Sequence, residues 1–113
     1  MPKKKLLDVT VRKRRWARGK GMGMGQMRFG DATQCCLGFV GRACGYTPAE
    51  LLGKCYPSGV AAATGRCCFP EALDSTLENK IGWVNDRDDI DDTERIERLT
   101  VLGREAGINF TFV

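Results

Sequence analysis

The sequence predicts a small α+β domain in which a central buried helix (residues 35–45) and a C-terminal helix (residues 92–106) pack on a short antiparallel sheet. Both helices place apolar side chains three to four positions apart, the spacing of one helix face. Residues 108–113 alternate apolar and polar side chains, which is typical of a half-buried strand. With 113 residues, 42% of them hydrophobic, the chain (residues 1–113) fits a single domain with one modest core.

The charges divide the chain into a basic arm and a mildly acidic body. Residues 1–30 carry ten Lys and Arg against one acid, a balance of +9, whereas residues 31–113 have a balance of −5. We expect residues 1–5 to fray and residues 12–25 to form a basic, Gly-rich flexible segment. A basic arm binds nucleic acid, a phosphate ligand, an acidic partner or the protein's own acidic loop, and the sequence leaves these alternatives open.

The first element falls at residues 5–15, where two patterns compete. The alternation of Leu7, Val9 and Val11 is that of a strand. Apolar residues three to four positions apart also share one helical face, and we favour the helix.

A glycine-rich stretch follows at residues 19–25. It lacks the residues of a Walker loop or of a dinucleotide-binding loop, so it predicts a flexible hairpin or a flap over a ligand. Residues 26–29 are expected to form a short strand that leads to the central helix.

The central helix is apolar on one broad side and carries glycine on the other. Free cysteine behaves as a small hydrophobe, so the thiols fit the apolar side. Gly38 and Gly41 lie inside the helix, where a glycine costs roughly 1 kcal/mol relative to alanine. That cost predicts a close approach, either of another backbone, which we favour, or of a ligand. Gly45 is expected to end the helix in a left-handed conformation.

Cys35 and Cys36 stand at the start of this helix, after Asp31 or Thr33 as its cap. A helix N-terminus lowers the pKa of a thiol and binds anions. However, the chain has no histidine, which excludes a Cys-His dyad, so we expect buried packing for most cysteines and no enzyme. The six cysteines lack C-x-x-C spacing, and we therefore expect no metal, no cofactor and reduced thiols in preference to disulfides.

The middle of the chain predicts one short helix and one loop. Thr47, Pro48 and Glu50 provide a cap, a first-turn proline and a capping box, which predict a helix at residues 47–53. Residues 54–70 are rich in Gly and Pro and predict a loop with a helical turn.

The segment before the last helix carries the polar residues of greatest interest. Trp83 is expected in the core or in the wall of a site, and Asn85 and Asp86 begin an acidic loop. This loop departs from a calcium loop, because an apolar residue stands at one ligand position and an acid replaces the glycine. Asp91 or Asp92 is expected to cap the last helix. The buried stripe of that helix consists of Ile96, Leu99, Leu102 and Ala106. The inward residues of the final strand are Ile108, Phe110 and Phe112.

Four motifs resemble a group of small, uncharacterised proteins that is common in bacteriophages and also found in actinobacteria. They are Trp-x-Arg-Gly (residues 16–19), Cys-Cys-Leu-Gly-Phe (35–39), Trp-Val-Asn-Asp (83–86) and Gly-Ile-x-Phe-x-Phe-Val (107–113). The group shares a Cys-x-x-Gly helix start and an Asn-Asp motif before a helix. The resemblance spans most of the chain and implies a phage or bacterial cytosolic origin, with no established activity.

These features together predict a non-enzymatic phage accessory protein that binds a small anionic, nucleotide-like ligand, for example to sequester a host defence signal. The Asn and Asp would contact a base or ribose, the arginines a phosphate, and a tryptophan would stack. The candidate ligand-binding residues are Arg15, Trp16, Arg18, Cys35, Cys36, Gly38, Trp83, Asn85 and Asp86. The alternative is a module that binds a host protein or nucleic acid through residues 12–20, and a thiol enzyme is less favoured.

The expected location is the cytoplasm, that of the host cell if a phage encodes the chain. The basic start is followed by no apolar run of a signal peptide, and no stretch reaches the 18 or more apolar residues of a membrane span. A homo-oligomer through the edge of the final strand is left open.

Overall fold

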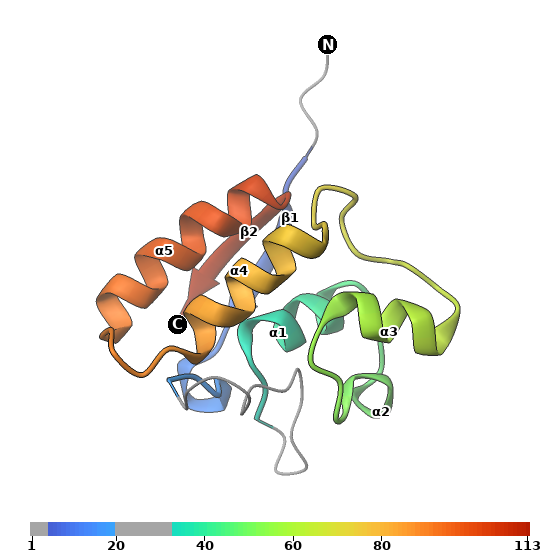
Figure 1. Cartoon of the computed structure of the whole chain (residues 1–113), viewed down its shortest axis with the longest axis horizontal. Coiled ribbons are helices and arrows are strands. Elements are labelled where there is room, and N and C mark those ends of the chain that lie inside the picture. The colour runs from blue at the N-terminus through green and yellow to red at the C-terminus, as the bar shows by residue number, and fades with distance from the viewer. Residues whose placement is uncertain (1–4, 20–32) are drawn as a thin grey trace.

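The computed structural model describes residues 5–19 and 33–113 (Figure 1). The elements of this described part are, in order, β1 (Leu7–Val11), α1 (Cys36–Ala43), α2 (Pro48–Leu51), α3 (Pro57–Thr64), α4 (Ser75–Asp86), α5 (Asp92–Glu105) and β2 (Ile108–Phe112). A 3₁₀ turn at Lys13–Arg15 follows β1, and we call residues 12–15 the basic turn. The predicted strand at residues 26–29 and all but the first residue of the predicted hairpin or flap lie outside the described residues.

The sheet consists of β1 and β2, which run parallel, with Leu7 opposite Ile108 and Val11 opposite Phe112. The predicted antiparallel sheet is therefore wrong. Alternation of apolar and polar residues shows which face of a strand is buried, but it carries no information on the direction of the neighbouring strand. Parallel strands need a long crossover, and here all five helices of the described part lie between the two strands in sequence.

The favoured helix at residues 5–15 is also wrong, because Leu7–Val11 forms β1 and Lys13–Arg15 forms only a 3₁₀ turn. Val9 and Val11 are buried, whereas Asp8 and Thr10 are exposed. The alternation thus prevails over the helical spacing, in keeping with the preference of β-branched valine for extended backbone.

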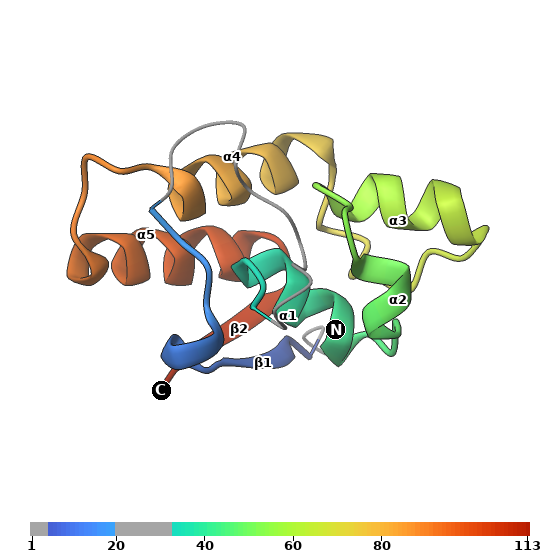
Figure 2. The ribbon, with the colours of Figure 1, turned by 90° about the horizontal axis from the view of Figure 1, so that it is seen from below.

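The helices cover one face of the sheet in two layers. α5 packs against β2 and α1 against β1, while α4 packs on both helices from the far side (Figure 2). α2 and α3 lie to one side of this body (Figure 1). The centre of the core is made up of Val9, Val11, Leu37, Val40, Ile81, Leu99, Ile108 and Phe110.

The predicted central helix is confirmed as α1, which is shorter than residues 35–45 at both ends. Five of its eight residues are buried. A Cβ atom on Gly41 would lie 2.7 Å from Leu51 Cδ2 of α2, so this glycine allows a neighbouring helix to approach closely. Gly45 has a φ of 96° and follows the helix in the left-handed region, as predicted.

The two other predicted helices are confirmed. Thr47 and Glu50 form the capping box of α2, and Gly53 follows with a φ of 75°. The side chain of Asp91 caps α5 by accepting a hydrogen bond from the Glu94 N–H. The loop predicted at residues 54–70 contains more helix than the expected turn, because α3 spans eight of these residues.

Candidate functional site

Asn85 lies at the end of α4, and its side chain is hydrogen-bonded to three other predicted site residues, Trp16, Cys36 and Asp86. Its Oδ1 atom accepts a hydrogen bond from Trp16 Nε1 at 2.7 Å and another from the Cys36 N–H at 3.1 Å. Its Nδ2 atom donates to the carbonyl oxygen of Ala17 and to Asp86 Oδ1, both at 3.0 Å. We call Trp16, Ala17, Cys36 and Asn85 the Asn85 network. It joins the segment after the basic turn to the start of α1.

The Asn85 network is closed to a ligand. Asn85 and Cys36 are fully buried, and Trp16 is only 4% exposed. Its indole ring also packs on Phe112, with the ring centroids 4.9 Å apart. No buried side-chain nitrogen or oxygen in the described part of the chain lacks a hydrogen-bond partner. These residues therefore hold the fold together, and Gly38 is likewise buried within α1.

The two thiols at the start of α1 are not activated. Burial raises the pKa of the Cys35 thiol to about 12 and the pKa of Cys36 well above its ordinary value, and the Asp86 carboxylate adds to both. The lowering expected at a helix N-terminus is outweighed by the loss of water. Cys35 itself is the N-cap residue, without a side-chain capping bond, so Thr33 is not the cap. Asp31 lies outside the described residues.

Arg18 belongs to a second polar cluster with Asp92 and Arg95. Its Nε and Nη2 atoms donate to the carboxylate of Asp92, and the shortest of these hydrogen bonds is 2.6 Å. Its guanidinium lies 4.4 Å from the centroid of the Trp16 ring. The hydrogen bonds from Arg18 lower the pKa of Asp92. Arg18 is therefore engaged within the protein.

Arg95 is a structural residue that the sequence analysis missed. It is 3% exposed and lies in α5 one turn before Leu99. Its guanidinium donates at 2.7 to 3.1 Å to the carbonyl oxygens of Val84, Asn85, Arg87 and Ile90. It thereby fixes the loop between α4 and α5. The signal was present in the sequence, since position 95 continues the apolar stripe of the helix with a charged residue.

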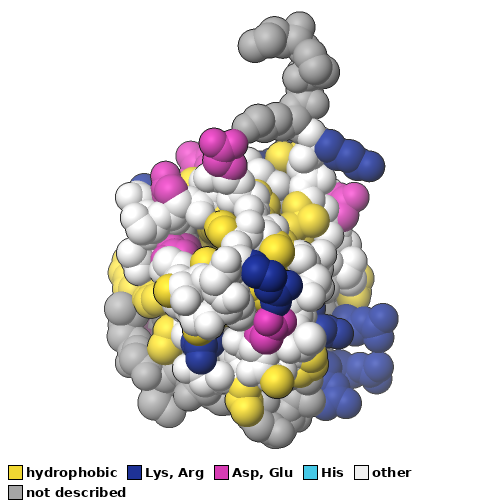
Figure 3. Space-filling model, turned by 90° about the vertical axis from the view of Figure 1, so that its right-hand side faces the viewer, with side chains coloured by type: hydrophobic (Ala, Val, Ile, Leu, Met, Phe, Trp, Pro, Cys, Tyr) yellow, Lys and Arg dark blue, Asp and Glu magenta, His cyan; other side chains and the backbone are white. Residues whose placement is uncertain are grey.

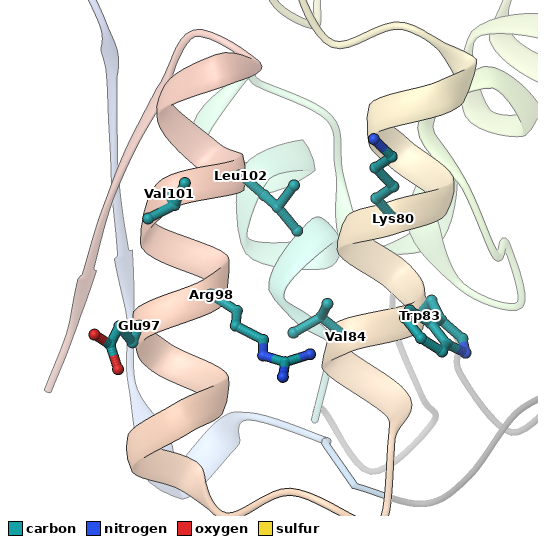
Figure 4. Close-up of a pocket in the computed structure, with 7 residues that line it drawn as sticks. All are labelled: Lys80, Trp83, Val84, Glu97, Arg98, Val101 and Leu102. Atoms are coloured by element: carbon teal, nitrogen blue, oxygen red, sulfur yellow. The ribbon is translucent and has the colours of Figure 1, made fainter.

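Trp83 lies away from the Asn85 network, on the outside of α4. Its side chain is 45% exposed, and the Arg87 guanidinium lies 4.5 Å from the ring centroid. Arg87 is in turn paired with Asp89 at 2.7 Å. The tryptophan forms one wall of a cavity of about 430 Å³ between α4 and α5 (Figure 4). The buried Cys35 and Asn85 do not line this cavity.

Arg15 belongs to the basic turn, whose four side chains are all exposed. Within residues 5–19 and 33–113, none of the four forms an ion pair. Figure 3 shows Lys and Arg side chains projecting along one edge of the molecule. A cavity of about 530 Å³ lies beside the turn, and among the described residues no Asp or Glu side chain lines it. It is lined by Thr10, Arg12, Lys13, Arg14 and Val113.

Comparisons with known proteins give no relative: the chain matches no protein-family model, no curated protein and no solved structure. The resemblance to small phage proteins stays a prediction. Across residues 5–19 and 33–113, no group of three or more Cys, Asp or Glu is placed to hold a metal ion. None of the helices in this part is long and apolar enough to cross a membrane. The function is therefore inferred from the surfaces of this chain.

Proposed function

We propose that the protein is a non-enzymatic binder of phosphate-rich polyanions, above all nucleic acid, and that it binds them through the basic turn. The observation that carries this proposal is the 530 Å³ cavity, which Arg12, Lys13 and Arg14 line without any Asp or Glu side chain. Cations gathered around one hollow attract phosphate by charge and by charge-assisted hydrogen bonds. The proposal keeps only the first part of the predicted interface at residues 12–20, since Arg18 is paired with Asp92.

The geometry of the turn favours a polymer over a single phosphate group. A 3₁₀ helix has three residues per turn, so successive side chains point about 120° apart. Arg12, Lys13 and Arg14 reach the hollow while Arg15 does not line it, so the four cations cover more surface than one phosphate group occupies. A spread of this kind meets successive phosphates along a strand, and duplex DNA offers one charge per roughly 1.7 Å of its length.

The site offers little that could read a base sequence. Among the described residues of the cavity lining, Thr10 supplies the one uncharged polar side chain. Trp16 follows the turn but is buried, so its ring is not available for stacking on a base. We expect affinity to come from phosphate contacts, which position a protein on nucleic acid without specifying sequence.

Salt dependence tests this proposal. The change is Arg12→Ala with Arg14→Ala, two exposed side chains that make no hydrogen bond within the described part. For the natural sequence, with three to four phosphate contacts, we expect log K to fall with log salt at a slope of about −3 on duplex DNA. The double variant is expected to lose about two units of slope. Fluorescence anisotropy of a labelled 20-base-pair duplex measures both.

The matched control is Lys54→Ala with Arg104→Ala, which removes the same charge from sites away from the turn. It should leave the slope near that of the natural sequence. A slope near zero for the natural sequence, or equal losses in the two double variants, would contradict the proposal.

A small nucleotide-like anion is the second candidate, because about 530 Å³ lies within the usual range for small-ligand pockets. Such a ligand could be a host defence signal that a phage protein sequesters. A thermal-shift panel of cyclic mononucleotides and dinucleotides separates the two candidates. Stabilisation by one member of the panel, abolished by Arg12→Ala with Arg14→Ala and absent with the duplex, would favour the small ligand.

A further inference from the structure

We infer that the hollow between α4 and α5 docks an acidic, amphipathic helical segment of another protein. This surface, the α4–α5 groove, has a volume of about 430 Å³. The described residues that line the groove are Lys80, Trp83, Val84, Glu97, Arg98, Val101 and Leu102. It shares no lining residue with the cavity at the basic turn, so this interaction is separate from nucleic-acid binding.

The bottom of the groove is apolar and its rim carries large apolar side chains. Val84 and Leu102 point toward each other from the two helices (Figure 4). Trp83 is 45% exposed and Val101 is 59% exposed. Exposed apolar side chains gathered in one hollow mark a protein interaction site more often than single exposed ones do.

Trp83 has the properties of an anchor for a partner. The Arg87 guanidinium lies against its ring, and the Arg87–Asp89 pair holds that guanidinium in turn. Part of the rotational freedom of the tryptophan is therefore already lost before a partner binds, which lowers the entropic cost of association. Tryptophan is also among the residues that contribute most to binding at protein interfaces.

The charges at the groove favour a partner that carries carboxylates. Lys80 comes from α4 and has no ion pair within the described part of the chain. The guanidinium of Arg98 reaches from α5 toward α4, whereas the carboxylate of Glu97 points away (Figure 4). Arg98 contacts Glu94 only at 3.4 Å, with both side chains more than 40% exposed, and a pair of this kind is weak.

The spacing of the lining residues favours a helix as the partner. α4 contributes Lys80, Trp83 and Val84, which stand at positions i, i+3 and i+4. α5 contributes Arg98, Val101 and Leu102 at the same spacing, together with Glu97. These positions form one ridge of a helix surface, and a third helix packs between two such ridges.

The two cations lie at opposite ends of the groove, with Val84 and Leu102 between them (Figure 4). A complementary helix would therefore carry apolar residues at i+3 and i+4, with acids at i and i+7. At about 1.5 Å per residue, those acids stand roughly 10 Å apart along the helix axis.

A designed peptide tests the inference. The probe is a 15-residue alanine-based helix with Glu at i and i+7 and Leu at i+3 and i+4. Its control carries Lys in place of both Glu residues. We expect isothermal titration to show saturable one-to-one binding of the acidic peptide, with at least a tenfold preference over the basic peptide. Trp83→Ala should weaken binding of the acidic peptide at least tenfold.

Charge reversal gives the second arm of the test. Lys80→Glu with Arg98→Glu should reverse the preference between the peptides, whereas Arg104→Glu, an exposed change on α5 outside the groove, should not. All these positions are exposed, and circular dichroism should show each variant folded.

Three results would overturn the inference. They are equal affinity for the two peptides, no saturable binding of the acidic one, and displacement of the peptide by an excess of the DNA duplex. Trp83-dependent binding to phosphatidylglycerol vesicles without peptide binding would assign the groove to a membrane surface instead. The DNA experiment tests the basic turn alone, so either proposal can fail without affecting the test of the other.

Discussion

Asn85 joins three segments that are far apart in the sequence, through hydrogen bonds to Trp16, Ala17 and Cys36. A fully buried amide is stable only when its donors and acceptors are satisfied, and here its partners are also buried. The network therefore depends on one side chain. The residues of the Asn85 network, which the sequence predicts to bind a ligand, are thus hydrogen-bonded to one another within the protein.

Replacing Asn85 tests that role. Asn85→Ala removes the acceptor of two buried donors and the donor of one buried carbonyl, and each group left unpaired costs about 1–3 kcal/mol. We expect the free energy of unfolding to fall by about 3 kcal/mol or more in urea titration. Asn79→Ala, an exposed amide on the same helix, should change it by less than about 0.5 kcal/mol. Equal losses at the two positions would mean that the network contributes little.

Two neighbouring carboxylates should affect stability with opposite sign as pH changes. The pKa of Asp92 is lowered, chiefly by hydrogen bonds from Arg18, so its contribution is present above the unfolded pKa of about 4 and is lost as pH falls through the folded value. The pKa of Asp86 is raised by burial, so its charge opposes folding at neutral pH. We expect Asp92→Asn to reduce the fall in Tm between pH 5 and pH 2.5.

Asp86→Asn, by the same reasoning, should leave Tm at pH 7 unchanged or higher, because the amide oxygen can still accept the Asn85 hydrogen bond. Thermal unfolding at a series of pH values measures both variants. A lower Tm for Asp86→Asn at pH 7 would show that the charged carboxylate is needed.

Sequence patterns included Trp16, Cys36 and Asn85 among the nine candidate ligand-binding residues but did not show that these three are buried. A ligand-binding site and a buried hydrogen-bond network use the same types of residue, polar side chains close to glycine and tryptophan. What separates the two cases is whether the remaining hydrogen-bond partners come from the protein, and this depends on segments more than 45 residues apart. The pairing of Arg18 with Asp92 could not be predicted from local patterns for the same reason, since the two residues are far apart in the sequence.

At the scale of elements, glycines within helices serve different purposes. A Cβ atom on Gly103 of α5 would lie 2.5 Å from Phe110 Cδ2 and 3.2 Å from the Ile108 carbonyl oxygen, so this glycine lets the helix pack directly on β2. Gly59 of α3 has no atom within 4 Å of its Cβ position. The first glycine is needed for packing, whereas the second is only a cost to the helix.

This difference predicts opposite effects of the same substitution. Gly59→Ala should raise the free energy of unfolding by about 0.5 kcal/mol, because alanine lowers the entropy of the unfolded chain. Gly103→Ala should lower it by about 1–3 kcal/mol through overpacking against Phe110, despite the better helix propensity of alanine. Urea titration of the two single variants measures the difference. Stabilisation by both would show that α5 can move away from β2 without loss.

The sequence predicts correctly the start of those helices that begin with a recognised capping residue. The capping box at Thr47 and the cap at Asp91 fixed the starts of α2 and α5 in the sequence. α4 begins at the equally regular cap Asp74, but the sequence predicts no helix there, because the glycines and prolines of residues 54–70 indicate a loop just before it. The sequence favours a helix at β1 because Leu7 and Val11 fit both the helical and the strand spacing.

For the whole molecule, the direction of strand pairing depends on the path of the chain between the two strands, which sequence patterns do not show. The parallel pairing of the first and last strands is set by how five helices of the described part return the chain, and no local pattern encodes that path. The charge asymmetry, by contrast, is visible in the sequence and corresponds to the exposed basic turn. The described part of the chain thus combines a closed polar network inside an apolar core with two separate outer surfaces, the cationic basic turn and the largely apolar α4–α5 groove.

One measurement tests the division between a closed core and a functional surface most directly: an NMR titration of the ¹⁵N-labelled protein with the DNA duplex. We expect the shifts to move at residues 10–15 and 113, while the indole signal of Trp16 and the side-chain amide signal of Asn85 stay in place. If those two buried signals move first and the basic turn does not respond, the Asn85 network is the binding site and this account is wrong.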